Sequence, residues 1–416
     1  MVRRFTAVAD DLTGANSLGG RWAGRGAGVC VSRHLDALRG VNACRILDVE
    51  TRHLGPGAAR AGVQAAWTAL GTSGLLYQKI DSTLRGNPGA EIEGLVLAAS
   101  APWVAVLPAY PNLGRQVLGG AVWVHGRRLD RTEYFQDPLS PSKVWRPGDL
   151  FPSACRAHIA LGAVAGGLSS LRKTLKSLLK RGPRFVTFDC ATAAQVRLIA
   201  DACLAEGCRH FSGAADLGGA LAEKFFGPAQ AAARPRLPPW IILAGSVSDV
   251  TFGQLAAWRE SGRLWDAEHG RLSGGSWRRN KPAGLLMLRR RYRAGGSVAL
   301  SSLACRKDLN PWRLGQARRG RSAERCAADA MESLVKRGLA VAGGPFRCGW
   351  FVTGGHTLRC LDDAAGFRRF HILGEVMPEV PLGLAEGPRG SAWLCSKPGG
   401  FGDRDCMVRF MGAQLG

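Results

Sequence analysis

The sequence predicts an α/β protein made of two three-layer domains, each with a mostly parallel sheet between layers of helices. Three observations carry this prediction. Short apolar runs alternate with helical segments, the chain of 416 residues is long enough for two sizeable cores, and a Pro- and Ala-rich stretch at 227–239 lacks periodicity. Such a stretch is typical of a linker, so we expect one domain at residues 1–232 and a second at 233–416.

The expected strands are short runs rich in apolar, β-branched or aromatic residues, and Ala-rich helical segments lie between them. Strands that alternate with helices in this way form βαβ units, whose crossovers are right-handed. In the first half, strands are expected at 5–9, 29–31, 44–49, 75–80, 103–107 and 185–188, and helices at 58–70 and 193–206. In the second half, strands are expected at 240–244 and 350–352.

The composition favours a globular protein that does not cross a membrane. Apolar residues make up 46% of the chain, yet no run approaches the roughly 20 apolar residues that a membrane helix needs. Residues 1–4 lead directly into a short strand and two acids, without the apolar core of a signal peptide. We therefore expect a cytoplasmic enzyme.

The twelve cysteines do not follow a metal-binding or disulfide pattern. None forms a Cys-x-x-Cys pair, and Cys30, Cys190 and Cys395 lie inside apolar runs. A free cysteine in such a run behaves as a small apolar residue. We expect buried thiols in a reducing compartment and assign no residue as a metal ligand.

The net charge of +24 makes nucleic acid a candidate partner. The basic residues are densest in 271–325, where 15 Lys or Arg stand against two acids. That stretch has no zinc-ligand spacing, recognition-helix pattern or aromatic ladder, and charge alone supports only non-specific affinity. A basic flank beside a site for anionic substrates also raises the local concentration of anions. We therefore expect a solvated or anion-steering surface rather than a nucleic-acid site.

Two adjacent aspartates, Asp10 and Asp11, stand where the first strand gives way to a helix. Thr13 and Gly14 are expected to supply the helix cap and the loose backbone of this turn. The pair by itself is equally consistent with helix-capping acids on a solvated loop. The cluster Lys79–Gly86, which also follows an apolar run directly, favours a ligand site at this edge of the sheet.

Polar residues follow several of the expected strands in the first half, and the carboxyl ends of parallel strands share one edge. Arg52 and Arg85 are suited to clamp a carboxylate with their planar forks. Asp11 or Asp81 is suited to take a proton from a hydroxyl. The alternative for any one of these residues is a surface salt bridge, but together they suit a hydroxy-acid substrate.

Three of the candidate residues add further donors. Ser82 and Thr83 are expected to open a helix and to offer hydroxyl and backbone donors at its positive end. Lys79, at the start of the same cluster, adds a cationic donor. The segment 108–115 is a further polar strand end of the same kind.

The second half contains three Gly-rich turns with hydroxyl side chains, at 245–248, 353–357 and 397–402. Glycine lets backbone N–H groups approach phosphate oxygens, and a following helix start attracts their charge. Neither a Walker sequence nor a dinucleotide-binding Gly-x-Gly-x-x-Gly after a strand is present. Three such turns in one domain favour a phosphate-binding cradle.

On these segments the chain resembles the four-carbon acid sugar kinases, which use ATP to phosphorylate tetronates such as threonate, erythronate or 3-oxo-tetronates. The most specific segment is 79–86. The resemblance runs nearly end to end, through residues 9–15, 51–52, 79–86, 108–115, 132–133, 137–138, 245–248, 354–357 and 397–402.

The resemblance implies an acid-sugar substrate-binding domain at 1–232, an ATP-binding domain at 233–416, and an active site in the cleft between them. It implies ATP and Mg²⁺ as cofactors and a small sugar acid as substrate, with no membrane partner, and it is compatible with a homodimer. The expected catalytic residues are Asp11, Asp81 and Lys79. The expected substrate-binding residues are Asp10, Arg52, Ser82, Thr83 and Arg85. The expected ATP-binding residues are Ser246, Ser248, Gly354, Gly355, His356, Thr357, Gly399 and Gly400.

The chain departs from the family's usual pattern at four motif positions. Ser17 and His356 each replace an Asp, Gln116 replaces a Thr, and Pro398 replaces a Ser. An Asp in a nucleotide loop can bind Mg²⁺ through water or accept a hydrogen bond from ribose, which His does poorly. A second interpretation therefore stays open: a weakened or inactive member that binds a sugar acid but binds ATP poorly.

Overall fold

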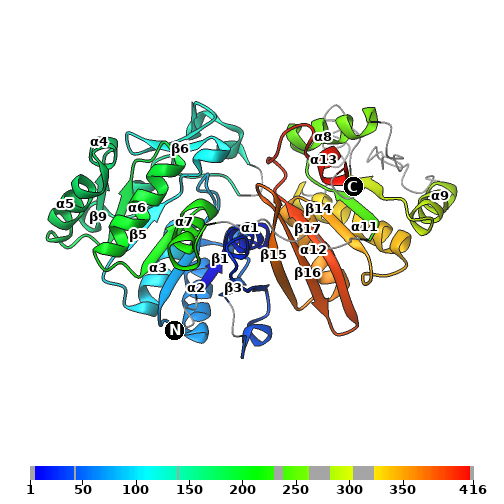
Figure 1. The fold of residues 1–416 in the computed structure, drawn as a ribbon, viewed down its shortest axis with the longest axis horizontal. Helices are drawn as coiled ribbons and strands as arrows, with labels where there is room; N and C mark the ends of the chain where they lie inside the picture. Colours follow the sequence, from blue (N-terminus) through cyan, green and yellow to red (C-terminus); the bar gives the residue numbers. More distant parts are fainter. Residues whose placement is uncertain are drawn as a thin grey trace. The chain divides into compact units, whose positions relative to one another are not determined.

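The computed structural model describes residues 5–41, 44–137, 140–228, 238–261, 282–302 and 323–412 (Figure 1). The chain divides into two compact units, Met1–Ala231 and Ala232–Gly416. Much of the basic stretch 271–325 lies outside the described residues. No helix in the described part of the chain is both long and apolar enough to cross a membrane.

The first unit is built on a parallel sheet with the strand order β2-β3-β1-β4-β11-β5-β10-β9. Its strands are almost entirely buried, as expected for a sheet covered on both faces, except for the edge strand β9, which is mostly partly exposed. They are β1 (Phe5–Ala9), β2 (Val29–Ser32), β3 (Cys44–Asp48), β4 (Leu75–Lys79), β5 (Val104–Leu107), β9 (Arg156–Ile159), β10 (Phe185–Phe188) and β11 (His210–Gly213).

Helices form two separate groups around this sheet. α2 packs on α3, whereas α1 packs on α7, α7 on α6 and α6 on α5. Because right-handed crossovers that step in opposite directions along a sheet place their helices on opposite faces, the two groups are the two outer layers. The helices are α1 (Leu12–Ala23), α2 (Pro56–Leu70), α3 (Pro88–Ala99), α4 (Leu161–Ala165), α5 (Gly167–Leu179), α6 (Ala193–Ala205) and α7 (Ala215–Phe226).

A small antiparallel sheet, β6-β7-β8, lies in the chain between β5 and β9. Two isolated bridges tie this region to the main body, Val117 to Cys190 and Arg85 to Ser142. The second bridge joins it to the turn after β4, where several candidate residues lie. The strands are β6 (Arg115–Leu118), β7 (Ala121–Val124) and β8 (Arg127–Arg128).

The second unit has the strand order β13-β12-β14-β17-β16-β15, parallel from β13 to β17 and antiparallel from β17 to β15. The strands are β12 (Trp240–Ala244), β13 (Val298–Ser301), β14 (Gly349–Thr353), β15 (Arg369–Met377), β16 (Val380–Gly387) and β17 (Gly390–Lys397). The helices are α8 (Asp249–Glu260), α9 (Pro282–Arg293), α11 (Ala323–Ala342), α12 (Gly355–Ala365) and α13 (Cys406–Gly412).

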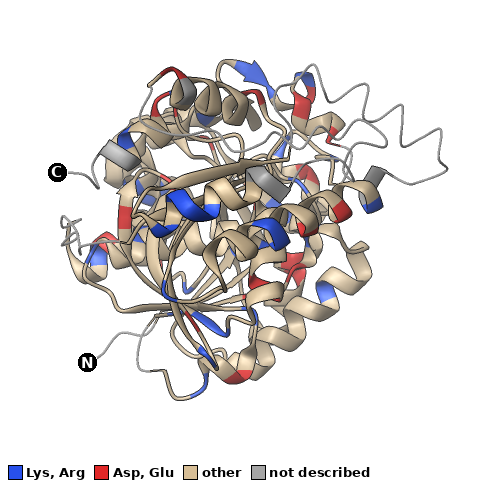
Figure 2. Cartoon of the chain, turned by 90° about the vertical axis from the view of Figure 1, so that its right-hand side faces the viewer, with Lys and Arg blue, Asp and Glu red and all other residues tan. Residues whose placement is uncertain are grey.

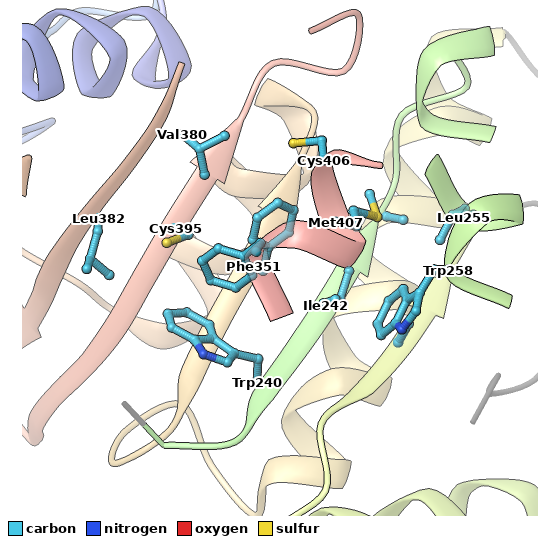
Figure 3. Close-up of a cluster of buried hydrophobic side chains, with 13 residues drawn as sticks. Trp240, Ile242, Leu255, Trp258, Phe351, Val380, Leu382, Cys395, Cys406 and Met407 are labelled. Atoms are coloured by element: carbon cyan, nitrogen blue, oxygen red, sulfur yellow. The ribbon is translucent and has the colours of Figure 1, made fainter. Parts of the chain in front are cut away.

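Alternate residues of β12 build the core of the second unit on the side of α8 and α13 (Figure 3). Trp240 and Ile242 point to this side, where Trp258 of α8 and Phe410 of α13 pack with them. Successive strand residues face opposite sides of a sheet, so Leu243 is left to the side of α11. Large apolar side chains on both faces hold the parallel strand ends in place.

The α/β class is confirmed, and the structure contains each expected strand with its bounds shifted by at most one residue. The hairpins β15–β16 and β16–β17 were not expected. Their two-residue connections are Pro378-Glu379 and Pro388-Arg389, rather than the Asn-Gly or Asp-Gly pairs that mark such turns in a sequence.

Candidate functional site

Two aspartates lie where β1 passes into α1. Asp11 is the N-cap of α1, and its carboxylate accepts a hydrogen bond from the backbone N–H of Gly14 at 2.9 Å. The expectation that Thr13 supplies the cap is wrong, because the extended backbone at Asp11 places that carboxylate over the unpaired N–H groups of the first turn. Asp10 is only 1% exposed, so the pair does not lie on a solvated loop.

Arg52 joins the two carboxylates. It lies in the short 3-10 turn η2 (Thr51–His53) after β3, which is the parallel neighbour of β1. Its Nε donates to Asp10 at 2.8 Å, and its Nη1 and Nη2 donate to the two oxygens of Asp11, each at 2.8 Å. All three guanidinium nitrogens thus hold carboxylates of the protein itself. A clamp on a substrate carboxylate by Arg52 stays a prediction.

The segment after β4 is a turn organised by Asp81. One oxygen of Asp81 accepts hydrogen bonds from the backbone N–H of Thr83 at 3.1 Å and from the Thr83 hydroxyl. The same carboxylate forms a two-pronged pair with Arg85, at 2.8 and 3.0 Å. Asp81 therefore holds both Thr83 and Arg85 in place. The guanidinium of Arg85 is bound by a carboxylate of its own turn.

This turn does not open a helix as expected. Leu84 and Gly86 adopt positive φ angles of 56° and 81°, which interrupt any right-handed helical path. Helix α3 begins later, at Pro88, a residue suited to the first helical position. Ser82 is buried, and its side chain makes no hydrogen bond with any residue that the structure describes. Its hydroxyl remains a donor for a ligand.

Lys79 ends β4 and brings an ammonium to the two aspartates of the β1–α1 junction. It is buried, and its Nζ donates to the carbonyl of Ile80 at 2.9 Å. Gly14 lies against it, because a Cβ there would be 2.8 Å from Lys79 Nζ and 2.6 Å from Asp11 Oδ1. A side chain at this position would therefore displace the ends of Lys79 and Asp11.

Asp10 and Asp11 are neighbours in the chain, but their acidities move in opposite directions. Burial raises the pKa of Asp10 above the ordinary 3.8, and attraction to Arg52 does not offset it. Burial acts against ionisation of Asp11 too, but Arg52, Lys79 and the N–H of Gly14 outweigh it and lower the pKa. Pairs whose environments separate their pKa values in this way are typical of functional sites.

Among Asp10, Asp11 and Asp81, the pKa of Asp81 is lowered the most. Burial works against its charged form, but Arg85 and Arg52 outweigh burial and hold the pKa well below 3.8. Asp81 is therefore ionised throughout the neutral range and accepts hydrogen bonds there rather than donating them.

Glu91 is a buried carboxyl of this site that the sequence reading missed. It lies on α3 and accepts a hydrogen bond from the Thr51 hydroxyl at 2.9 Å, while its second oxygen has no partner among the described residues. Thr51 precedes Arg52 directly, so Glu91 anchors the turn that carries this arginine. Burial raises the pKa of Glu91 well above 4.5. The sequence signal that could have identified Glu91 was an acidic residue in a mostly apolar helical segment.

Replacing Glu91 by glutamine is expected to stabilise the protein at neutral pH. Because the folded pKa is raised, folding keeps a proton that the unfolded chain releases above about pH 4.5, and the free energy of unfolding falls as pH rises toward the folded pKa. Each pH unit in that window costs on the order of 1 kcal/mol. Glutamine keeps an oxygen for Thr51 without this cost.

The gain is measured by urea unfolding at about pH 5, 6 and 7, and it should grow with pH. Glu93→Gln is the matched control on the same helix, since Glu93 is partly exposed and forms a 3.7 Å pair with exposed Arg60. It should change stability by less than about 1 kcal/mol at every pH. A Glu91→Gln protein that is no more stable at pH 7 than at pH 5, relative to wild type, contradicts the prediction.

In the second unit, the turn after β12 carries a cluster of hydroxyls. Ser248 Oγ donates to the carbonyl of Gly399 at 2.6 Å, and Thr251 Oγ1 of α8 donates to the same carbonyl at 3.0 Å. Ser246 Oγ donates to Ser248 Oγ at 3.2 Å. The structure thus brings two of the three predicted Gly-rich turns into contact.

The remaining Gly-rich turn begins α12. Gly354 is the N-cap at φ 102°, a conformation that favours glycine, and no side chain caps the helix. Its N–H donates to the carbonyl of Lys397 at 3.0 Å, which joins this turn to the other two. Thr357 is buried, while Gly355 and His356 are half-buried. A helix start without a side-chain cap is a favourable place for a phosphate group.

Two residues that hold these turns were not assigned a role from the sequence. Lys397 is fully buried before the turn 398–402, and Gln254 of α8 donates to the carbonyls of Phe401 and Asp403 at 3.0 and 2.8 Å. A lysine at the end of an apolar strand, directly before a Gly-rich turn, was the available signal for Lys397.

The described cysteines are free thiols, and all but Cys155 and Cys360 are buried. Among the described residues, no group of three or more His, Cys, Asp or Glu is placed to hold a metal ion.

Comparisons with known proteins agree with this division into two kinds of site. Residues 5–223 match the family model described as "Sugar-binding N-terminal domain", and residues 241–407 match the "Nucleotide-binding C-terminal domain". A D-threonate kinase of Salmonella typhimurium is 27% identical, over 96% of this chain and 95% of its own length. A D-threonate kinase of Cupriavidus necator is 29% identical, over 95% and 94%. A D-erythronate kinase of Heliobacterium modesticaldum is 32% identical, over 46% of each chain.

Solved structures share the fold. A Salmonella typhimurium protein superposes with a TM-score of 0.78 at 21% identity, covering 99% of both chains. A Haemophilus influenzae protein superposes with a TM-score of 0.71 at 20% identity, covering 99% of this chain and all of its own. The family models and the named relatives confirm the resemblance found in the motifs. The chain belongs to the four-carbon acid sugar kinase family, with a sugar-binding N-terminal domain followed by a nucleotide-binding C-terminal domain.

Proposed function

We propose that this protein is an ATP-dependent kinase that phosphorylates a hydroxyl of a four-carbon sugar acid of the threonate, erythronate or 3-oxo-tetronate type. The observation that carries the proposal is the charged cluster at the end of β1 and β4. There Lys79, Arg52 and Arg85 meet Asp10, Asp11 and Asp81. A sugar acid needs cations for its carboxylate and carboxylate acceptors for its hydroxyls, and this cluster supplies both.

Asp11 and Asp81 are assigned to the substrate hydroxyls. Their side chains are 19% and 12% exposed, and both are ionised at neutral pH because their pKa values are lowered. One of them orients the attacking hydroxyl and accepts its proton. A low pKa is no obstacle to this role, since phosphoryl transfer depends mainly on positioning and charge neutralisation.

The substrate carboxylate is assigned to the turn after β4. The Ser82 hydroxyl is a donor there, and Thr83 and Arg85 are held beside it by Asp81. Arg52 holds Asp10 and Asp11 in place and adds positive charge, and Lys79 neutralises charge on the transferred phosphoryl group.

The nucleotide is assigned to the three Gly-rich turns of the second unit. Glycine N–H groups and the uncapped start of α12 suit phosphate oxygens, and hydroxyls lie beside them. The proposed ATP-binding residues are Ser246, Ser248, Gly354, Gly355, His356, Thr357, Gly399 and Gly400. The three turns contain no carboxylate, so Mg²⁺ is expected to enter as the MgATP complex, held mainly by phosphates and water.

Purified protein is expected to release ADP only when a suitable tetronate is present. A coupled ADP assay with MgATP and a panel of four-carbon sugar acids measures this, with the thermal unfolding transition as evidence of folding. A folded protein without turnover on any member of the panel contradicts the proposal.

The second candidate, a member that binds the sugar acid but binds ATP poorly, is motivated by His356 and Pro398 in the nucleotide turns. Calorimetric titration separates the two candidates. Binding of a sugar acid together with MgATP binding supports the kinase, whereas sugar-acid binding alone supports the second candidate.

Binding of nucleic acid by this protein is not the favoured function. In Figure 2 basic and acidic residues are interspersed along the described helices and strands. The described part of the basic stretch is mainly α9, where Arg289, Arg290, Arg291 and Arg293 lie. The rest of the basic stretch for which an anion-steering surface was predicted is 271–281 and 303–322, which lie outside the described residues.

A further inference from the structure

Lys397 is a buried amine that the proposed reaction does not use. It ends β17, and none of its surface is exposed. Its Nζ donates to the carbonyl oxygens of Phe401 at 2.8 Å, Pro398 at 2.9 Å and Gly399 at 3.4 Å. An ammonium has three N–H donors, so each of them meets one carbonyl of the same short turn.

Side chains of the segment that begins α8 hold this turn as well. Ser248 and Thr251 both donate to the Gly399 carbonyl, and Gln254 donates to the Phe401 carbonyl. The protein therefore engages the carbonyl oxygens of the turn. Among the described residues, by contrast, the backbone N–H groups of Gly399 and Gly400 make no hydrogen bond. Successive unengaged N–H groups are the donors from which phosphate-binding concavities are built.

We propose that Lys397 is the positioning residue of the nucleotide turn: its ammonium binds the carbonyl oxygens of Pro398, Gly399 and Phe401 and so leaves the N–H groups of Gly399 and Gly400 to bind the phosphates of ATP. This inference rests on the proposed function, because it assigns the turn to ATP. A neutral amine has two N–H donors instead of three, so deprotonation removes one of the three hydrogen bonds from Lys397 that hold the turn and leaves the turn less well held. The protonated form is therefore the form that binds ATP.

Lys397 loses its proton in a pH range that is easy to reach by experiment. Burial lowers its pKa from 10.5 to about 8. The titratable group that faces it is Cys406 of α13, whose pKa burial raises above 9.0, so the thiol stays neutral up to that pH. The neighbours from β14 and α8, which are Thr353, Ser248, Thr251 and Gln254, carry no charge.

The stability effect of this lysine runs opposite to the effect on ATP binding. Because the folded pKa is lowered, the unfolded chain binds more protons than the folded chain between about pH 8 and 10.5, so the contribution of Lys397 to stability increases as pH rises through that window. ATP affinity is expected to decrease over the same window. A merely structural lysine would change stability over this window and leave the ATP affinity unchanged.

The test is the affinity of the full-length protein for MgATP, measured by calorimetry without sugar acid at pH 7, 8 and 9. At pH 9 about one tenth of the protein would retain the proton, so the affinity should be about 10-fold weaker than at pH 7. The nucleotide phosphates are already ionised throughout this range. An affinity that does not change between pH 7 and 9 overturns the inference.

Lys397→Met and Lys336→Met are the paired variants. Lys336 lies on α11 with 75% of its side chain exposed, so its replacement should leave the affinity and its pH profile as in wild type. Lys397→Met should bind MgATP at least about 10-fold more weakly at pH 7, with little further change at pH 9. Retention of wild-type affinity by Lys397→Met overturns the inference. If this variant does not fold, the wild-type profile decides.

If the proposed kinase function is wrong, the experiments give a different result from the one expected if only the inference about Lys397 is wrong. A wild-type protein that binds no nucleotide at any pH contradicts the kinase assignment. The inference about the turn is then decided by the hydrogen-exchange protection of the Phe401 N–H, which donates to the Pro398 carbonyl at 3.2 Å, with each rate taken relative to the intrinsic exchange rate at the same pH. Protection should fall between pH 7 and 9 in wild type and be low at both pH values in Lys397→Met. Equal protection in both proteins and at both pH values overturns it.

Discussion

Replacing Arg52 by alanine is expected to lower both stability and activity sharply. Arg52 is the partner of Asp10 and Asp11 through three hydrogen bonds of 2.8 Å, and Asp10 is almost fully buried. Removal of one member of a buried ionic cluster leaves charge without compensation and costs about 3–5 kcal/mol. Turnover should fall at least about 100-fold, because the carboxylates lose the positions they need. Urea unfolding and the coupled ADP assay measure the two effects.

Arg60→Ala is the matched control, since Arg60 is half exposed and its only ionic partner among the described residues is the partly exposed Glu93 at 3.7 Å. That replacement should change stability by less than about 1 kcal/mol. The stability defect of Arg52→Ala should also shrink toward about pH 4, where protonation of the two aspartates removes the uncompensated charge. A variant of normal stability that lacks activity contradicts the positioning role and favours direct contact with the substrate.

Replacing Gly399 by alanine is expected to abolish or strongly weaken nucleotide binding. A Cβ at this position would lie 2.6 Å from the Ser246 Cβ and closer still to its hydroxyl. Two turns that both carry proposed ATP contacts must then move apart, and such overpacking costs about 1–3 kcal/mol. MgATP affinity should fall at least about 10-fold. Calorimetry with MgATP measures the loss, and sugar-acid titration of the same protein should be unchanged.

Gly253→Ala is the control for this variant. Gly253 lies inside α8, and a Cβ there would meet nothing within 4 Å. Alanine in a helix interior without a clash should add roughly 0.5–1 kcal/mol of stability and leave MgATP affinity as it is. Wild-type MgATP affinity in Gly399→Ala would show that close packing of these turns is not needed for the site.

Local patterns made the fold predictable. A strand such as Phe5–Ala9 is a run in which four of five residues are apolar, and an α/β sheet buries such runs on both faces. The strand ends then indicate which polar residues share an edge. The hairpins of the second unit were missed because their turns contain Pro-Glu and Pro-Arg, and their pairing depends on partners in the sheet rather than on turn chemistry.

The candidate site was predictable in its membership but not in its pairing. The sequence indicated Asp10, Asp11 and Arg52 as members, because each lies within three residues after an expected strand. It did not indicate that Arg52 donates its hydrogen bonds to these two aspartates. That pairing depends on the distances in the folded structure between side chains that are about 40 residues apart in the sequence. The turn at Ser82 likewise became a turn because Asp81 binds its backbone and Arg85 together.

The sequence alone therefore determined the α/β class, the expected strands, the Gly-rich turns and the family, because these depend on residue type and spacing along the chain. The tertiary structure decided which charges neutralise one another and which titratable groups lose contact with water. Glu91 and Lys397 show this best, since both are ordinary charged residues in the sequence. Burial shifts their pKa values in opposite directions, away from the charged form in each case, and burial is a property of the packed fold.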